Sequence, residues 1–174
     1  LLNINASPFY PGKRRARHDL IVRHLTKLRK PFVYINTTGA ADNGKNIIPF
    51  DGESLVYDEH ARLIAIGRQF AEDLVIVDTD GPSRTLPAVV REREMYDALV
   101  MALGDYMRKT GFSRAVVAVS GGIDSALAVA IAVDALGADH VSAFNMPSQF
   151  NTETTRSIAA DLARRGEPGH HRQH

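Results

Sequence analysis

Residues 115–125 read AVVAVSGGIDS, and the apolar run ALAVAIAV follows at residues 126–133. The run before Ser120 is rich in valine and free of charge, which predicts a strand buried on both faces of a parallel sheet. Gly121 and Gly122 permit a sharp turn, and the second apolar run predicts a helix that ends near Gly137. This stretch therefore predicts a strand, a tight turn and a helix within an α/β fold.

The turn at residues 120–125 has the composition of an anion site. Glycines leave backbone amides open to a ligand, and the start of a helix carries partial positive charge, to which the hydroxyls of Ser120 and Ser125 add donors. Asp124 would repel a phosphate unless a cation stood between them, so the sequence implies Mg²⁺ with Asp124 as its ligand. No lysine follows the glycines, which argues against a Walker loop. A plain turn that binds nothing is the structural alternative.

Residues 118–125 resemble the signature loop of the N-type ATP pyrophosphatases. The resemblance implies cleavage of ATP between its α and β phosphates. It also implies an ATP site formed by Ala118, Val119, Ser120, Gly121, Gly122, Ile123, Asp124 and Ser125. GMP, asparagine and argininosuccinate synthetases and tRNA-thiolating enzymes share this loop. A second strand is predicted from His140 to Asn145. After it, Met146-Pro147-Ser148, then Thr154-Thr155-Arg156-Ser157 and a helix predicted at residues 158–163, are more similar to NAD synthetases than to these other enzymes.

Residues 1–80 predict a different arrangement, with one amphipathic helix and several short strands. The helix runs from Gly12 to Lys30, where Pro31 stops it. The strands are predicted at residues 1–4, Phe32–Asn36, Ser54–Tyr57, Leu63–Ile66 and Leu74–Val77.

This first part resembles the C-terminal half of the nitrilase-like amidase domain of glutamine-dependent NAD synthetases. The resemblance rests on Asn5-Ala6-Ser7-Pro8-Phe9, Tyr34-Ile35-Asn36 and Phe50-Asp51-Gly52, among other segments. It implies that Ser7 and Lys13 bind glutamine, whose carboxylate an ammonium group would hold by a charge-assisted contact. Without the resemblance, Ser7 would be a turn residue and Lys13 a solvated lysine on a helix face.

A turn-rich segment at residues 80–87 predicts a linker between two parts. We assign residues 1–80 to the amidase domain, 81–90 to the linker and 91–174 to the start of a synthetase domain, with an atypical tail at 166–174. The helix predicted from Arg91 to Lys109 should bury Met95, Leu99, Ala102, Leu103 and Tyr106. The expected fold class is α/β: half of a nitrilase-like αββα sandwich, then the start of a Rossmann-like doubly wound parallel sheet.

The resemblance as a whole implies a carbon–nitrogen ligase that amidates deamido-NAD to NAD. ATP would form an adenylated intermediate with release of pyrophosphate, and ammonia from glutamine would then displace AMP. The substrates would be deamido-NAD, glutamine and ATP, and the full-length enzyme would be a homo-oligomer. The amidase Cys, Glu and Lys of the family lie upstream of the Asn5 segment, and this chain has no cysteine, so we assign no catalytic residue.

We therefore expect a fragment truncated at both ends and inactive alone. A non-catalytic ATP-binding remnant, or another adenylating ligase such as a tRNA-modifying enzyme, are the alternatives. The 174 residues carry a net charge of +1, which does not suggest a nucleic-acid partner. No apolar run approaches the roughly 20 residues of a membrane span, so we expect a cytoplasmic protein without a membrane partner.

Three further segments imitate functional motifs. Residues 39–46 resemble a Walker loop but lack its hydroxyl, so we predict a surface loop. The basic residues at positions 13–17 predict a solvated helix face rather than a nucleic-acid site. His170, His171 and His174 predict a disordered end rather than a metal site.

Overall fold

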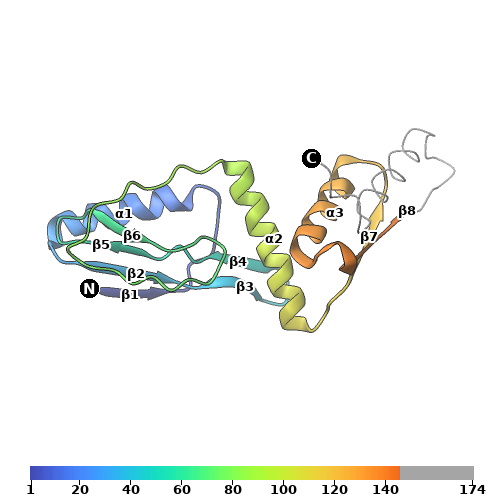
Figure 1. Cartoon of the computed structure of the whole chain (residues 1–174), viewed down its shortest axis with the longest axis horizontal. Coiled ribbons are helices and arrows are strands. Elements are labelled where there is room, and N and C mark those ends of the chain that lie inside the picture. Colours follow the sequence, from blue (N-terminus) through green and yellow to red (C-terminus); the bar gives the residue numbers. More distant parts are fainter. Residues whose placement is uncertain (146–174) are drawn as a thin grey trace. The chain divides into compact units, whose positions relative to one another are not determined.

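The computed structural model describes residues 1–145 (Figure 1). It divides the chain into two compact units, Leu1–Ala102 and Leu103–His174, and helix α2 (Arg91–Thr110) contributes to both. The predicted boundary at residues 81–90 stays a prediction. The helix predicted at 158–163, the Met146-Pro147-Ser148 segment and the tail with its three histidines lie outside the described residues.

The first unit contains a four-stranded mixed sheet in the order β1-β2-β5-β6 and a separate two-stranded hairpin of β3 and β4. Strand β1 is parallel to β2, whereas β2, β5 and β6 pair antiparallel. The elements are β1 (Leu2–Asn5), α1 (Lys13–Leu28), β2 (Phe32–Asn36), β3 (Thr38–Asp42), β4 (Ile47–Asp51), β5 (Leu55–Tyr57) and β6 (Leu63–Ile66).

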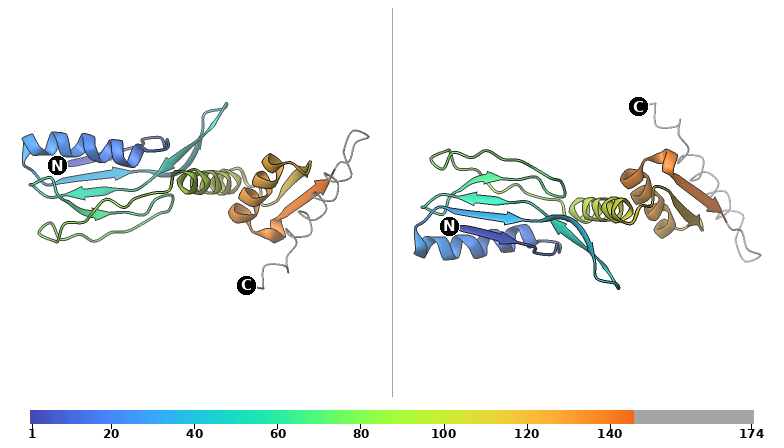
Figure 2. Two further views of the ribbon diagram at one scale, coloured as in Figure 1. Left: turned by 90° about the horizontal axis from the view of Figure 1, so that it is seen from above. Right: turned by 90° about the horizontal axis from the view of Figure 1, so that it is seen from below.

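Helix α1 lies along one face of the four-stranded sheet (Figure 2). Ile21 and Leu25, one turn apart, are buried against Tyr34, Leu55, Tyr57 and Leu63 of the sheet. The helix ends at Arg29, which adopts a left-handed conformation and donates its N–H to the Leu25 carbonyl at 2.9 Å. Pro31 then prevents continuation, as predicted.

The surface loop predicted at residues 39–46 is wrong in part, because residues 39–42 belong to β3. The turn itself is short: Asp42 and Asn43 accept backbone N–H groups of the following residues through their side chains, as Asx turns do. Strand β4 tolerates Pro49 because its missing N–H is not needed by β3, and the Pro49 carbonyl accepts the Phe9 N–H at 2.8 Å.

The strand predicted at Leu74–Val77 is also wrong. The segment has no strand structure, and Leu74 and Ile76 are 88% and 94% exposed. An apolar run forms a strand only where another strand can pair with it. Among the described residues, no strand pairs with this segment.

The second unit contains a strand, a helix and a parallel strand. Strand β7 (Ala115–Val119) leads through the glycine turn into α3 (Ile123–Leu136), and the short helix η1 (Ala138–His140) precedes β8 (Val141–Asn145). The two strands pair in register from Ala115 opposite Val141 to Val119 opposite Asn145. This confirms the predicted elements and gives a mixed α/β fold with a parallel strand pair.

Burial of β7 on both faces was a wrong prediction for the described residues. Val119 is buried with Val129 of α3, whereas Val116, on the other face, is 73% exposed. Only one face of the strand pair packs against α3, so the apolar residues of β7 are not buried on both faces.

Helix α2 occupies nearly the predicted range, but its buried face is only partly the predicted one. Ala102 is buried as predicted, Leu103 and Tyr106 are half-buried, and Met95 and Leu99 are exposed. The other buried residues of the helix are Glu94 and Ala98. The buried row begins with a carboxylate, which a search for apolar residues would pass over. No helix in residues 1–145 is long and apolar enough to cross a membrane.

Candidate functional site

The glycine turn between β7 and α3 is held by its own two serines. The Ser125 hydroxyl accepts the Ser120 N–H at 3.2 Å and donates to the Gly122 carbonyl at 3.0 Å. The two hydroxyl oxygens lie 3.2 Å apart, and the Ser120 hydroxyl accepts the Gly122 N–H at 3.3 Å. The side chains that order the turn, Ser120 and Ser125, are therefore two of the residues predicted from the sequence to bind ATP.

Gly121 gives this turn its shape. Its φ of +83° lies in the left-handed region, where a side chain is unfavourable. The amides of Ile123 and Asp124 then open α3 and have no acceptor within the helix. Backbone donors and the positive end of the helix dipole meet at an exposed turn, which is the arrangement that binds phosphate.

Asp124 is exposed in the first turn of α3. No group of three or more His, Cys, Asp or Glu side chains that could hold a metal occurs within residues 1–145. Mg²⁺ commonly uses one carboxylate and completes its shell with phosphate oxygens and waters. A single exposed carboxylate beside a phosphate turn therefore fits Mg²⁺ that arrives with a nucleotide.

Ser7 and Lys13 line the same pocket in the first unit, of about 590 Å³. Lys13 is buried and donates from Nζ to the Pro8 carbonyl, and the ammonium lies 5.4 Å from the centre of the Tyr10 ring. Burial, and to a lesser degree the charge of Arg17, lowers the pKa of Lys13. The solvated helix-face alternative for Lys13 is therefore wrong.

The walls of this pocket combine basic and apolar side chains. Arg17 and His24 add to Lys13, Tyr34 and Leu25 form part of the apolar wall, and none of the described lining residues is acidic. A second pocket of about 480 Å³, lined by Val33, Ile35 and Val56, holds none of the predicted site residues. The pocket lined by Ser7 and Lys13 suits a small ligand that carries a carboxylate.

A buried polar cluster that the sequence analysis missed adjoins the pocket. Arg17 donates two hydrogen bonds from Nη2 to Asp51, at 2.8 and 2.9 Å, and Asp51 also accepts from Asn36 Nδ2 at 2.9 Å. Burial disfavours the charge of Arg17, but the hydrogen bonds and charge of Asp51 outweigh it and raise the pKa of Arg17. Asn36 in turn contacts the backbone of Ser7.

The cluster continues from Arg14. Its guanidinium pairs with Glu53 and donates to Gln69 Oε1 at 3.1 Å, and Gln69 donates to Glu94 Oε1 at 2.8 Å. Burial raises the pKa of Glu53, and Arg14 opposes this shift. Arg14 and Arg17 are buried, so the predicted solvated face is wrong for them, whereas Arg15 is exposed as predicted.

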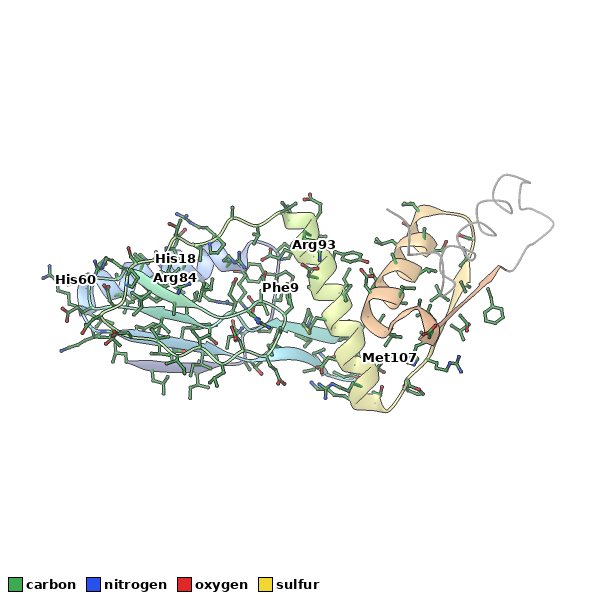
Figure 3. The ribbon with its side chains drawn as sticks, viewed as in Figure 1. Phe9, His18, His60, Arg84, Arg93 and Met107 are labelled. Atoms are coloured by element: carbon green, nitrogen blue, oxygen red, sulfur yellow. The ribbon has the colours of Figure 1, made fainter. Side chains whose placement is uncertain are left out.

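Two residues between Ser7 and Lys13, Phe9 and Gly12, contact distant parts of the first unit. Phe9, which is labelled in Figure 3, packs edge-on against Phe70 with ring centres 5.1 Å apart. The Gly12 N–H donates to Glu94 Oε2 at 3.4 Å. Asn36 and Asp51 belong to two segments on which the family resemblance rests, but the sequence analysis assigned no role to either residue. No local sequence signal identifies them, because basic residues on a helix need buried acidic partners only where the fold buries them.

Comparison with known proteins gives consistent relatives. Residues 95–168 match the family model described as NAD synthase. The chain is 36% identical over 172 residues to the glutamine-dependent NAD(+) synthetase of Synechocystis sp., covering 94% of this chain and 30% of that protein. It is 38% identical over 165 residues to the enzyme of the same name from Xylella fastidiosa (strain 9a5c), covering 90% and 30%.

A solved structure is similar over the same extent. The glutamine-dependent NAD+ synthetase from Acinetobacter baumannii, in complex with adenosine diphosphate, matches with a TM-score of 0.86 and 36% identity. The match covers 94% of this chain and 32% of that chain. The chain thus spans about 30% of the length of the curated relatives it matches.

Proposed function

We propose that this chain, which is related to the glutamine-dependent NAD(+) synthetases along nearly all of its own length, carries one ligand site for each half of their reaction. The turn at Ser120–Ser125 binds ATP with Mg²⁺. The pocket of Ser7 and Lys13 binds glutamine. The overall reaction is the ATP-dependent amidation of deamido-NAD to NAD.

The observation that carries this proposal is the serine-held glycine turn at the start of α3. It lies inside the segment that matches the NAD synthase model, and it joins a left-handed Gly121 to the first amides of a helix. The related Acinetobacter baumannii structure was solved with ADP. Both points support a nucleotide phosphate as the ligand of this turn.

The proposed domain boundary at residues 81–90 lies earlier in the chain than the division between the two compact units, which falls between Ala102 and Leu103. Residues 1–80 form part of a nitrilase-like glutamine amidohydrolase domain, which the mixed sheet covered by α1 supports. Residues 91–174 form part of a synthetase domain with Rossmann-like topology, which the β7–α3–β8 unit with parallel strands supports. Residues 81–90 connect them.

The proposed chemistry proceeds in two steps. A carboxylate oxygen of deamido-NAD attacks the α-phosphorus of ATP, and pyrophosphate leaves with both electrons of the broken P–O bond. Ammonia released from glutamine then attacks the acyl carbon, AMP leaves and the amide of NAD remains. The amides and hydroxyls of the turn stabilise charge that develops on pyrophosphate. Mg²⁺, held by Asp124, would neutralise phosphate charge when bound.

The nucleotide site is tested by calorimetric titration of the chain with ATP and Mg²⁺. The variant Ser125→Ala removes the hydroxyl that orders the turn, and we expect a loss of about tenfold in ATP affinity. Ser113→Ala, at an exposed serine just before β7, is the matched control and should leave affinity unchanged. Equal affinities for both variants would refute the site.

The glutamine site is tested separately, because the ligands differ. We expect Ser7→Ala and Lys13→Met each to weaken L-glutamine binding by about tenfold or more, because each removes a polar or charged contact. Arg15→Met, an exposed change on the same helix, should have no effect. Because the chain covers a minority of its relatives' length, we expect no NAD formation from the 174 residues alone.

A further inference from the structure

We propose that Asn36 is a positioning residue for glutamine: its carboxamide fixes the backbone of Ser7, so that the Ser7 hydroxyl is presented to the pocket. The inference rests on the proposed glutamine site. Asn36 belongs to β2 and lines the pocket of about 480 Å³, whereas Ser7 and Lys13 line the pocket of about 590 Å³.

The geometry is a two-sided clamp on a single residue. The Ser7 N–H donates to Asn36 Oδ1 at 2.9 Å, and Asn36 Nδ2 lies 3.4 Å from the Ser7 carbonyl as its donor. Ser7 follows the end of β1 and belongs to no strand, so the sheet ladder does not hold it. The carboxamide supplies the hydrogen bonds that a neighbouring strand would otherwise provide.

The orientation of that carboxamide is set by Asp51. An ionised carboxylate only accepts hydrogen bonds, so Nδ2 must face Asp51, at 2.9 Å, and Oδ1 must face the Ser7 N–H. Asp51 is fully buried and is held by both Nη2 bonds of Arg17. Arg17 stacks at 5.0 Å from the centre of the Tyr34 ring, and both side chains line the glutamine pocket.

A chain of contacts therefore runs from α1 to Ser7 through three side chains that are each at most 7% exposed. The Asn36 carboxamide has one acceptable orientation, because a flip would place Oδ1 against the Asp51 carboxylate and Nδ2 against the Ser7 N–H. A residue that only filled space at this position of β2 would need neither amide atom. The use of both amide atoms on Ser7 indicates that its position is what Asn36 secures.

A double-variant cycle distinguishes positioning from general stabilisation. Glutamine affinity is measured by calorimetry for the wild-type chain, Ser7→Ala, Asn36→Ala and the double variant. If Asn36 acts through the Ser7 hydroxyl, Asn36→Ala should cost about tenfold with Ser7 present and less than about twofold in the Ser7→Ala background. Equal losses in the two backgrounds, or no loss in either, would overturn the inference.

A second measurement needs no ligand, and its first part uses the wild-type chain alone. Hydrogen exchange followed by NMR should show the Ser7 amide of the wild-type chain protected, although Ser7 lies outside the strands. In Asn36→Ala that protection should fall by about tenfold or more, while the Phe9 amide, which donates to Pro49, keeps its own. An unprotected wild-type Ser7 amide would overturn the inference even if Asn36→Ala failed to fold.

Tyr57→Phe is the matched control. It removes one hydroxyl from the same core, 2.8 Å from His18 Nδ1, without touching Ser7 or Asn36. We expect it to leave the affinity cycle and the Ser7 protection unchanged. A wild-type chain with a protected Ser7 amide but no glutamine binding would reject the proposed glutamine site and leave the anchoring of Ser7 in place.

Discussion

Replacing Arg17 by methionine should destabilise the first unit strongly. The side chains of Arg17 and Asp51 are 5% and 0% exposed, and two hydrogen bonds of 2.8 and 2.9 Å join them. Methionine fills much of the same volume but leaves Asp51 as a buried charge, for which Asn36 is the remaining side-chain donor within residues 1–145. Removing one partner of a buried ion pair typically costs about 3–5 kcal/mol.

The assay is urea unfolding followed by the near-ultraviolet circular dichroism of the tyrosines. With an m-value of about 2 kcal/mol/M, the expected loss lowers the unfolding midpoint by roughly 2 M urea. Arg15→Met is the control, because Arg15 pairs with Asp19 four residues away on the exposed face of the same helix. An exposed pair contributes about 0.5 kcal/mol, so the control midpoint should move little.

The double variant Arg17→Met with Asp51→Asn refines the reasoning. Asparagine removes the stranded charge, so the double variant should recover part of the stability that Arg17→Met loses. The reasoning is refuted if Arg17→Met costs no more than Arg15→Met. The explanation by an unpaired buried carboxylate is also contradicted if the double variant is less stable than Arg17→Met alone.

Three further predictions concern Asp124, Gly121 and His18. Asp124→Ala should weaken ATP binding only when Mg²⁺ is present, by about tenfold in calorimetric titration, and equal losses with and without Mg²⁺ would contradict a metal role. Gly121→Ala should cost about 1 kcal/mol through its left-handed φ and also weaken ATP binding, whereas Gly111→Ala, with a φ of +78°, should carry only the backbone cost. Burial lowers the pKa of His18 from 6.5, so the unfolded chain binds this proton more readily and stability should fall as pH drops below about 6.5. Urea midpoints at about pH 7.5 and about pH 5 check this, with His18→Gln reducing the difference; a higher midpoint at the lower pH would contradict it.

The elements that sequence predicted well are those whose signals are local. The strand, turn and helix of residues 115–136 follow from an apolar run, two glycines and a second apolar run, and α1 follows from its period and Pro31. The pocket shared by Ser7 and Lys13 was reached through family resemblance, and each residue alone was indistinguishable from an ordinary surface residue.

The errors on α1 and α2 have a common physical cause, which is pairing between distant parts of the chain. Arg14 and Arg17 are buried because Glu53 and Asp51 lie opposite them, and no local pattern shows that pairing. The buried face of α2 begins with Glu94, whose partner Gln69 lies 25 residues earlier. Composition at positions 13–17 therefore predicted solvent exposure where the fold provides acidic partners instead.

Pro49 affects how readily the edge of β4 can associate with a strand of another copy of the chain. Its carbonyl points to the side of β4 where Phe9 docks, so the missing N–H belongs to that same outer edge. A foreign strand approaching there would find one donor absent and one acceptor already occupied. A residue that looked like an obstacle to secondary structure thus gives the hairpin an edge that resists the strand-to-strand association from which aggregates grow.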